Sequence, residues 1–375
     1  MIRSGAIALA LCLAACSPRA NESYPPKVDS TGRLAAVHIA SDLATLTDPS
    51  GALSLAEVRQ RDEDWLPHAH QTPTFGYTSA THWLRFRVEN RGVAARQVVL
   101  LIDNEYIDRL EIYGLISDLV SGQRAMAAGN DPAAPIAFQF LSGRELPFYE
   151  RELVNRKYAF PLELAAGSRY EILLSARSDH SLNVPVFLLD PADYGERRGR
   201  ENLRMGLYAG LFVLLFVSTL AAFLALRDRM FLLYIAYLGF SFLYQFSLQG
   251  YAYKYLWPGA PGWASIFNLL AFSPSVALAA LFGREFLELR TRHPLIDRLV
   301  LWQAIGWLLL PLGLLFASVG AIEKLIADAL APLVLFSVNL AGWQAYRHGY
   351  TPARFYVLAW ALYVSFAVCY LLQIT

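Results

Sequence analysis

The segment MGLYAGLFVLLFVSTLAAFLAL, Met205–Leu226, decides the fold class of this chain. It contains no charged residue and ends at the triplet Arg227-Asp228-Arg229. Because a transmembrane helix needs about 20 consecutive apolar residues, this segment predicts a membrane span. Residues before about position 200 mix polar and apolar side chains, whereas those after it are mostly apolar. The change in composition predicts an exported domain followed by an all-α membrane bundle over about 204–375.

Five further apolar runs predict five further spans. They are about Phe231–Leu248, Ser265–Phe282, Leu299–Val319, Ile322–Ala345 and Phe355–Thr375. With the N-terminus outside, the predicted inside loops hold eight arginines and the outside loops only Lys254 and Lys324, which agrees with the positive-inside rule. Four arginines just before the first span, at positions 197, 198, 200 and 204, oppose this orientation locally. We expect the export signal to override them.

The first 16 residues predict an export signal. Arg3 precedes a short apolar run, Gly5–Leu13, that is too short to span a bilayer. The following Leu-Ala-Ala-Cys ends at Cys16 and looks like a lipobox, at which a bacterial lipoprotein signal is cut and the cysteine acylated. A lipid on Cys16 would add an anchor of about 0.8 kcal/mol per buried CH₂. The alternative is an ordinary signal peptide with an incidental cysteine, and both place the next domain in the periplasm.

Residues 22–195 predict an all-β periplasmic sandwich. The run HWLRFRVE, His82–Glu89, alternates apolar and polar side chains with the period of a half-buried strand. Other strand-like runs are Gln97–Asp103, Arg109–Tyr113, Lys157–Leu164, Arg169–Leu174 and Asn183–Asp190. Short strands separated by turn signals favour an antiparallel sandwich, most of all a jelly roll. Ser54–Asp62 predicts a short helix, and the small, polar stretch Ser121–Gly143 predicts a long loop.

Three residues of this domain are candidates for ligand binding. Trp83 shares a strand face with charged side chains, and Asn104 and Tyr106 follow a strand-like run. Aromatic rings beside amides and carboxylates suit a sugar, so a small-molecule ligand, with carbohydrate as the class considered, is the predicted partner. The competing interpretation packs Trp83 beneath a loop and assigns Asn104 to a turn.

Asp328 is the candidate relay residue of the bundle. It lies about one and a half turns into the fifth predicted span. A carboxylate in hydrocarbon costs about 2.5–3.5 kcal/mol on insertion scales, so such a side chain normally faces a partner or water. Asp328 therefore either pairs inside the bundle and helps to set its resting state, or lies close enough to the outer interface to reach water.

The sequence predicts no catalytic residue, no metal and no cofactor. None of the seven histidines lies in the middle of a predicted span, which argues against haem ligation and against an intramembrane Ser-His protease. His68 and His70 lack a second pair nearby for zinc, and no phosphate-binding glycine loop is present. The net charge of +1 gives no field for nucleic acid. We expect a chain that is not an enzyme and does not bind nucleic acid.

Short motifs in both halves of the chain point to one family. In the membrane half they are LRDRMFLLY at 226–234, QGYAYKYLWP at 249–258, REFL at 284–287 and HGYTPARF at 348–355. In the other half they are HWLRF at 82–86, IDNEY at 102–106 and YAFPL at 158–162. In this order they resemble the bacterial seven-transmembrane receptors with diverse intracellular signalling modules. The first half is similar to the family's jelly-roll extracellular domain.

The resemblance implies a sensor in the bacterial inner membrane. A periplasmic ligand would change the sandwich, the bundle would transmit the change, and a cytoplasmic module, usually a diguanylate cyclase, histidine kinase or phosphatase, would act. Six spans are seen, while the family's seventh helix and output module are absent. The chain is then either a fragment or signals through a separate cytoplasmic protein. The alternative is a transporter or transport-associated protein with a periplasmic binding domain, against which stand the lack of an inverted repeat and the few polar residues inside spans.

Overall fold

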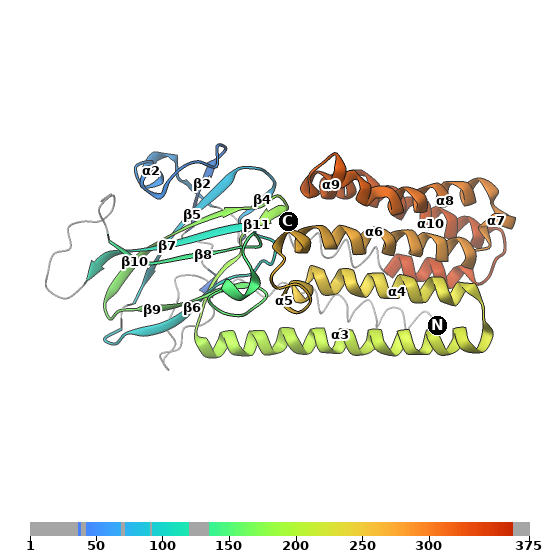
Figure 1. The fold of residues 1–375 in the computed structure, drawn as a ribbon, viewed down its shortest axis with the longest axis horizontal. Coiled ribbons are helices and arrows are strands. Elements are labelled where there is room, and N and C mark those ends of the chain that lie inside the picture. Colours follow the sequence, from blue (N-terminus) through green and yellow to red (C-terminus); the bar gives the residue numbers. More distant parts are fainter. Residues whose placement is uncertain (1–36, 39–42, 69–71, 91, 120–134, 363–375) are drawn as a thin grey trace.

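The computed structural model describes residues 37–38, 43–68, 72–90, 92–119 and 135–362. A β-sandwich lies at one end of the molecule and a helix bundle at the other (Figure 1). The predicted fold class, an all-β domain followed by an all-α membrane domain, is therefore confirmed. The leader at 1–16, with the candidate lipid anchor Cys16, lies outside the described residues.

Two antiparallel sheets face each other in the sandwich. The larger has the order β3-β2-β5-β10-β7-β8 and the smaller β1-β12-β6-β9. The larger comprises β2 (Ala44–Asp48), β3 (Leu66–Pro67), β5 (Thr81–Glu89), β7 (Arg109–Leu119), β8 (Ile136–Ser142) and β10 (Ser168–Arg177). The smaller comprises β1 (Val37–His38), β6 (Arg96–Ile102), β9 (Tyr158–Leu164) and β12 (Val186–Leu189). A separate pair joins β4 (Thr74–Tyr77) to β11 (Ser181–Asn183).

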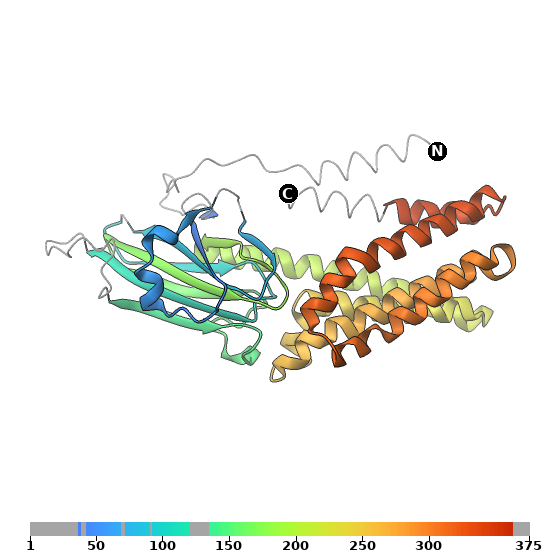
Figure 2. The same ribbon diagram turned by 90° about the horizontal axis from the view of Figure 1, so that it is seen from above.

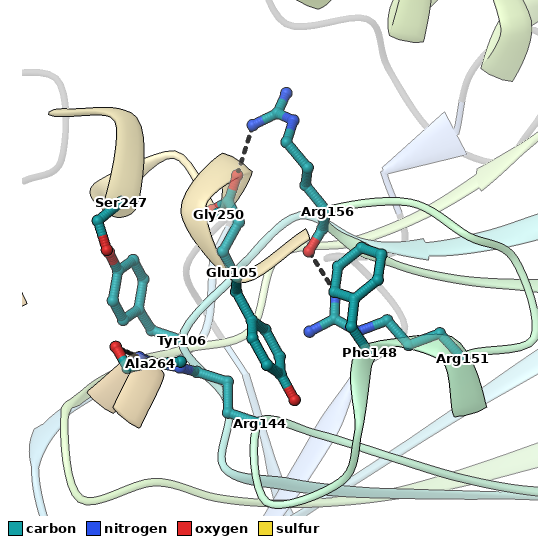
Figure 3. A pocket seen from close by; sticks show the side chains of 10 residues that line it. Glu105, Tyr106, Arg144, Phe148, Arg151, Arg156, Ser247, Gly250 and Ala264 are labelled. Atoms are coloured by element: carbon teal, nitrogen blue, oxygen red, sulfur yellow. Dashed lines mark hydrogen bonds and ion pairs between the residues drawn. The ribbon is translucent and has the colours of Figure 1, made fainter. Parts of the chain in front are cut away.

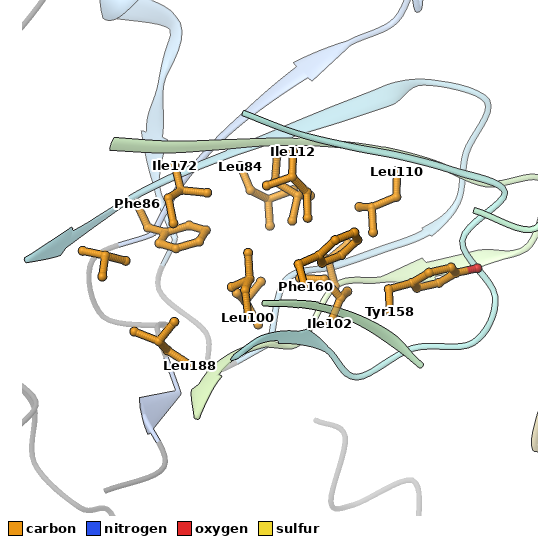
Figure 4. Close-up of a cluster of buried hydrophobic side chains, with 14 of the residues drawn as sticks. Leu84, Phe86, Leu100, Ile102, Leu110, Ile112, Tyr158, Phe160, Ile172 and Leu188 are labelled. Carbon is orange, nitrogen blue, oxygen red and sulfur yellow. The ribbon is translucent and has the colours of Figure 1, made fainter. Parts of the chain in front are cut away.

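The core lies between the two sheets and follows the alternation of the strands. Leu84 and Phe86 of β5 face Leu100 and Ile102 of β6 and Phe160 of β9, and all five are at most 1% exposed (Figure 4). Each such side chain contributes about 1.5–3 kcal/mol by burial. The predicted period of two in His82–Glu89 is confirmed, and it places Trp83 on the opposite face of the larger sheet.

Two local predictions in this domain have different outcomes. The short helix is present as α2 (Leu55–Arg59), and Ser54 and Glu57 close a capping box at its start. The long loop predicted over Ser121–Gly143 is wrong in its second part, because residues 136–142 form β8 and pair with β7. The ring of Phe138 lies where a Cβ at Gly114 of β7 would be, so a glycine there makes room for the aromatic strand.

The bundle contains helices of very different lengths. They are α3 (Pro191–Leu226), α4 (Arg229–Leu248), α5 (Tyr251–Tyr255), α6 (Pro261–Phe286), α7 (Leu289–Arg292), α8 (Pro294–Leu309), α9 (Val319–Leu325) and α10 (Ala331–Arg347). Within the described part of the chain, four helices are long and apolar enough to cross a membrane: α3, α4, α6 and α8 with its extension to Leu315. They correspond to the first four predicted spans. A helix over Ala353–Leu362 begins the sixth, whose remainder lies outside the described residues.

Prolines mark the irregular places in the last helices. Pro311 lies where α8 gives way to a 3₁₀ segment, Leu310–Leu315. Pro332 follows a π-helical turn, Ile326–Leu330, which interrupts the fifth predicted span between α9 and α10. Proline lacks the N–H that bonds to the carbonyl four residues earlier, so both irregularities have a local cause.

The helices lie alongside one another, and α4 contacts both α3 and α6, while α6 contacts α8 (Figure 2). In Figure 1, α3 runs along one edge of the bundle from the sandwich to the far end, and α5 lies between the sandwich and α4. This arrangement brings sandwich loops and helix ends together in one junction.

Candidate signalling site at the junction of sandwich and bundle

The α3 helix joins the two domains without an intervening loop. The last strand, β12, ends at Leu189, Asp190 occupies the N-cap position, and Pro191 is the first helical residue. The helix then continues for 36 residues, about 54 Å, through the first predicted span. An ion pair of 3.1 Å between Arg96 of β6 and Asp190 ties its start to the smaller sheet. The predicted limits of the two domains, 195 and 204, both fall inside this helix.

A cluster of partly buried charges attaches the sandwich to the outer part of α3. Lys157, before β9, pairs with Asp103, after β6, and its Nζ lies 2.8 Å from Glu201 of α3. Arg156 reaches the same Glu201 at 3.1 Å, and Arg197 of α3 pairs with Asp103. Arg197 was one of the arginines that opposed the predicted orientation, and its charge is offset here by carboxylates from both domains.

Burial and pairing act against each other on these groups. Burial alone would raise the pKa of Asp103, but Lys157 and Arg197 outweigh it and hold that pKa below its usual value. Burial would lower the pKa of Lys157, yet Asp103 and Glu105 raise it overall. The pKa of Glu105 is raised, because burial exceeds the attraction of Lys157 and Arg156. The ionised form of Asp103 is thus stabilised by its neighbours. For Glu105, the neighbouring cations do not fully offset the cost of burying the charge.

Arg156 extends this cluster to the end of α4. Its Nη1 donates to the carbonyl oxygen of Gln249 at 2.5 Å, and its guanidinium lies 4.2 Å from the ring centroid of Tyr251. Tyr251 in turn contacts Asn202 of α3 at 3.2 Å. One sandwich side chain therefore touches both α3 and the α4–α5 connection.

A second arginine, Arg151, organises the loop that rests on α5. It donates to the carbonyl oxygens of Asn155 and Arg156 at 3.0 and 2.5 Å, and burial lowers its pKa. Its guanidinium lies over the rings of Phe148, Tyr158 and Tyr253. Figure 3 shows the small cavity beside it, about 10 Å³, enough for about one water molecule.

A third contact joins the sandwich to the start of α6. Asn268 donates to the hydroxyl of Tyr106 at 2.9 Å, and Arg144 donates to the carbonyl oxygen of Ala264 at 2.5 Å. The guanidinium of Arg144 lies 4.7 Å from the ring centroid of Tyr106, whose pKa burial raises.

A fourth contact reaches α9. Nδ1 of His180 lies 2.8 Å from Oε2 of Glu323, and Nε2 of His180 lies 3.1 Å from Nη1 of Arg144. Gly320 of α9 packs so closely that a Cβ there would overlap the carbonyl oxygen of Asp179. The junction therefore fixes the sandwich to α3, α5, α6 and α9.

Comparison with known protein families agrees with this architecture. The family model described as "7TMR-DISM extracellular 2" matches residues 40–190, and the one described as "7TM diverse intracellular signalling" matches residues 201–375. The chain belongs to the 7TMR-DISM receptors. The first matched region ends at the N-cap of α3 and the second begins inside this helix, so one helix joins the extracellular domain of this receptor to its membrane domain.

Other comparisons add little. A search of curated proteins finds no match. Among solved structures, CsCBM6-3 from Clostridium stercorarium in complex with cellobiose is similar over 32% of this chain and 82% of its own, at 11% identity and a TM-score of 0.16. A score that low supports no statement about the receptor's fold or ligand.

The receptor places Trp83 apart from the other two candidate ligand residues, Asn104 and Tyr106. Trp83 is 3% exposed and lies in a cluster with Val58 of α2, Trp65 and Tyr113. Asn104 and Tyr106 lie together at the junction, where Oδ1 of Asn104 accepts from the backbone N–H of Tyr106 at 2.6 Å. Asn104 also donates to the carbonyl oxygen of Asn183 at 2.7 Å. Asp328 belongs to the π-helical turn, and its side chain lies outside the described residues.

Sequence reasoning missed most of the junction. The loop at 144–156 carries exposed glutamates at 145, 150 and 152, whereas its arginines Arg144, Arg151 and Arg156 are only 5–7% exposed. One available signal was the density of arginine and lysine directly before the alternating strand at 158–164. The other was the aromatic run after the second span, in which Tyr251 and Tyr253 are buried against the sandwich.

Proposed function

We propose that this 7TMR-DISM protein is a ligand-responsive receptor of the bacterial inner membrane, with its sandwich in the periplasm. The carrying observation is that α3 starts directly at β12 and continues into the first predicted span. A hydrogen-bonded helix transmits a displacement of its first turn along its length. Contacts to α5, α6 and α9 give the sandwich further points of attachment to the bundle.

Hydrogen–deuterium exchange on the full chain in lipid nanodiscs tests this coupling without knowledge of the ligand. The substitution Glu201→Gln removes a charge that Arg156 and Lys157 share. We expect faster exchange in the loop at 150–157 and also at the far end of the bundle, over 287–293. Glu196→Gln, on the same helix but 67% exposed, is the matched control. A change confined to the junction would contradict the proposal.

The order of the strands supports a jelly roll for the sandwich. Along the chain β5 lies in the larger sheet, β6 in the smaller, β7 and β8 in the larger, β9 in the smaller, β10 in the larger and β12 in the smaller. The resulting orders β1-β12-β6-β9 and β5-β10-β7-β8 are those of two interleaved Greek keys, with β2 and β3 added at one edge.

Asp328 remains the proposed relay of the bundle. It lies in the π-helical turn that follows α9, the helix that His180 contacts through Glu323. Single π-helical turns are frequent at functional sites. We expect Asp328→Asn to preserve expression and to change exchange over 331–347. Unchanged exchange there would remove Asp328 from the relay.

We further infer that residues 1–375 perform no chemistry themselves, that their signal passes to a cytoplasmic signalling module, and that Cys16 carries a lipid. Support for the lipid comes from the Leu-Ala-Ala-Cys sequence, and intact-mass measurement of the mature protein tests it. A carbohydrate ligand also remains a proposal, supported by the sequence pattern around Trp83, Asn104 and Tyr106. Sugars are therefore included in the binding experiment below.

A further inference from the structure

A cavity of about 300 Å³ lies between the sandwich and the ends of two helices. Three sandwich loops contribute Asp108, residues 144–145 and residues 179–180, while Pro261 and Gly262 come from α6 and Val319 from α9. The volume is in the range of small-molecule sites, which occur preferentially between domains. This cavity is distinct from the single-water space beside Arg151.

The sandwich side of the cavity carries carboxylates. Asp108 is held in place, because its Oδ2 accepts from the backbone N–H of Asp179 at 2.7 Å and from the hydroxyl of Ser178 at 3.2 Å. Glu145 and Asp179 are exposed and line the same cavity. In the described part of the chain, no group of three His, Cys, Asp or Glu side chains is placed to hold a metal ion. An organic ammonium group therefore fits this side better than a bare cation.

The side of the cavity next to α6 is electropositive, because the side chain of Arg144, although from a sandwich loop, reaches the carbonyl oxygen of Ala264 there. Arg144 lines it and is only 6% exposed. Helix α6, 26 residues long, begins there at Pro261 with no side-chain cap. The first N–H groups of a helix lack intrahelical partners and form the positive end of its dipole. A buried guanidinium beside such a helix end is suited to a carboxylate group.

The remaining wall is small and apolar. Pro261 and Val319 contribute it, and a Cβ built on Gly262 would meet no atom within 4 Å. A ligand there needs opposite charges on its two sides and a small apolar remainder between them.

We propose that this junction cavity binds a small zwitterion of the α-amino-acid class, with its ammonium group toward Asp108, Glu145 and Asp179 and its carboxylate toward Arg144 and the start of α6. The inference rests on the proposed receptor function and adds the ligand class and its place. Arg144 also bonds to Ala264 of α6 and to His180, which contacts Glu323 of α9. A ligand on Arg144 thus acts directly on the contacts that join the sandwich to two helices.

Binding is tested on the full chain in nanodiscs by thermal shift and titration calorimetry, with the common L-amino acids at millimolar concentration as probes. We expect at least one small apolar amino acid to raise the Tm. Its carboxamide and its decarboxylated amine, which each lack the negative charge, should bind about tenfold more weakly or worse. A shift with cellobiose or glucose but with no amino acid overturns the inference, as does an amine that binds as tightly as its parent amino acid.

Three variants locate the site. Gly262→Leu fills the cavity without changing charge, and we expect it to abolish binding while the unliganded Tm stays close to that of the parent. Glu145→Gln and Asp179→Asn should each weaken binding, since they remove exposed carboxylates from the lining. Glu152→Gln, an exposed glutamate of the same loop outside the lining, is the control. Full binding by Gly262→Leu overturns the placement.

The outcome is separable from that of the receptor proposal. If Glu201→Gln alters exchange at the far end of the bundle but no amino acid binds, coupling stands and the zwitterion site is wrong. If an amino acid binds in the cavity without changing exchange beyond it, the site stands and the receptor proposal is wrong.

Discussion

Lys157 Nζ lies 2.8 Å from Glu201 Oε1, an ion pair between the residue before strand β9 and the helix that continues into the first predicted membrane span. Both side chains are largely buried, at 13% and 12% exposure. Because each also contacts another charge of the opposite sign, the pair belongs to a network in which the removal of one member leaves others uncompensated. This network makes the attachment of sandwich to bundle sensitive to single charges.

The first prediction concerns Glu201→Gln. Removing one partner of a buried ion pair typically costs about 3–5 kcal/mol, because the remaining charge stays buried. We expect a loss of stability of this size, measured as a lower Tm of the full chain in nanodiscs. The control, Glu196→Gln, breaks an exposed pair with Arg200 and should change stability by no more than about 0.5 kcal/mol. Equal effects of the two variants would mean that the network does not hold the junction.

Sequence patterns predict elements that depend on neighbouring residues, but not contacts between residues far apart in the chain. Period-two alternation in His82–Glu89 and the apolar run Met205–Leu226 are local signals, and both elements form as predicted. The prediction of a loop over Ser121–Gly143 was wrong in its second part for a physical reason. Strand β8 carries Phe138 opposite Gly114 of β7, so its fit depends on a residue more than 20 positions away.

The junction depends on still longer separations. His180 and Glu323 are 143 residues apart, and Arg144 and Ala264 are 120 apart. Arg144, His180 and Glu323 each look like ordinary polar surface residues in their own segments, and Ala264 takes part only through its backbone carbonyl oxygen. Tyr106 and Asn104 were singled out for a pattern that suits sugars, and the structure instead brings them together through a local hydrogen bond beside α6.

A second prediction tests the packing of α9 against the sandwich. A Cβ at Gly320 would overlap the carbonyl oxygen of Asp179, so Gly320→Ala forces the helix end away from the loop. Overpacking of this kind costs about 1–3 kcal/mol. Gly306→Ala on α8 is the control, since nothing lies within 4 Å of its Cβ position and alanine favours a helix. We expect a lower Tm and faster exchange over 318–326 for Gly320→Ala alone; matching behaviour of the two variants would contradict the close approach.

A third prediction is the tautomer of His180. A guanidinium has donors and no acceptor, so Nε2 of His180, 3.1 Å from Nη1 of Arg144, accepts a hydrogen bond. The proton then resides on Nδ1, which donates to Glu323 at 2.8 Å. Nitrogen-15 NMR of the imidazole should show a protonated Nδ1 and an unprotonated, hydrogen-bond-accepting Nε2. Arg144→Met removes the donor to Nε2 and should therefore remove the preference for a proton on Nδ1. A spectrum of the Nε2–H form in the parent protein would refute the predicted hydrogen bonds of His180.

A fourth prediction uses the opposite pKa shifts of two neighbouring carboxyls. The pKa of Asp103 is lowered by Lys157 and Arg197 despite burial, so its ionised form stabilises the folded state above the unfolded pKa of about 3.9, and this contribution is lost as pH falls through the lower folded value. The pKa of Glu105 is raised by burial, so its ionised form costs stability at neutral pH, and that cost disappears on acidification.

The two matched variants should therefore change the stability of the folded protein in opposite directions. At neutral pH, Asp103→Asn should lower stability by about 1.5–3 kcal/mol, the range for a hydrogen bond to a charged group, whereas Glu105→Gln should raise the Tm. Both differences from the parent should shrink as pH falls, the one for Glu105 first, because that carboxyl takes up its proton at the higher pH. Melting curves of the three proteins from about pH 7 to about pH 3 measure this. A loss of Tm in Glu105→Gln at neutral pH would show instead that its contact with Arg156, at 3.5 Å, outweighs its burial.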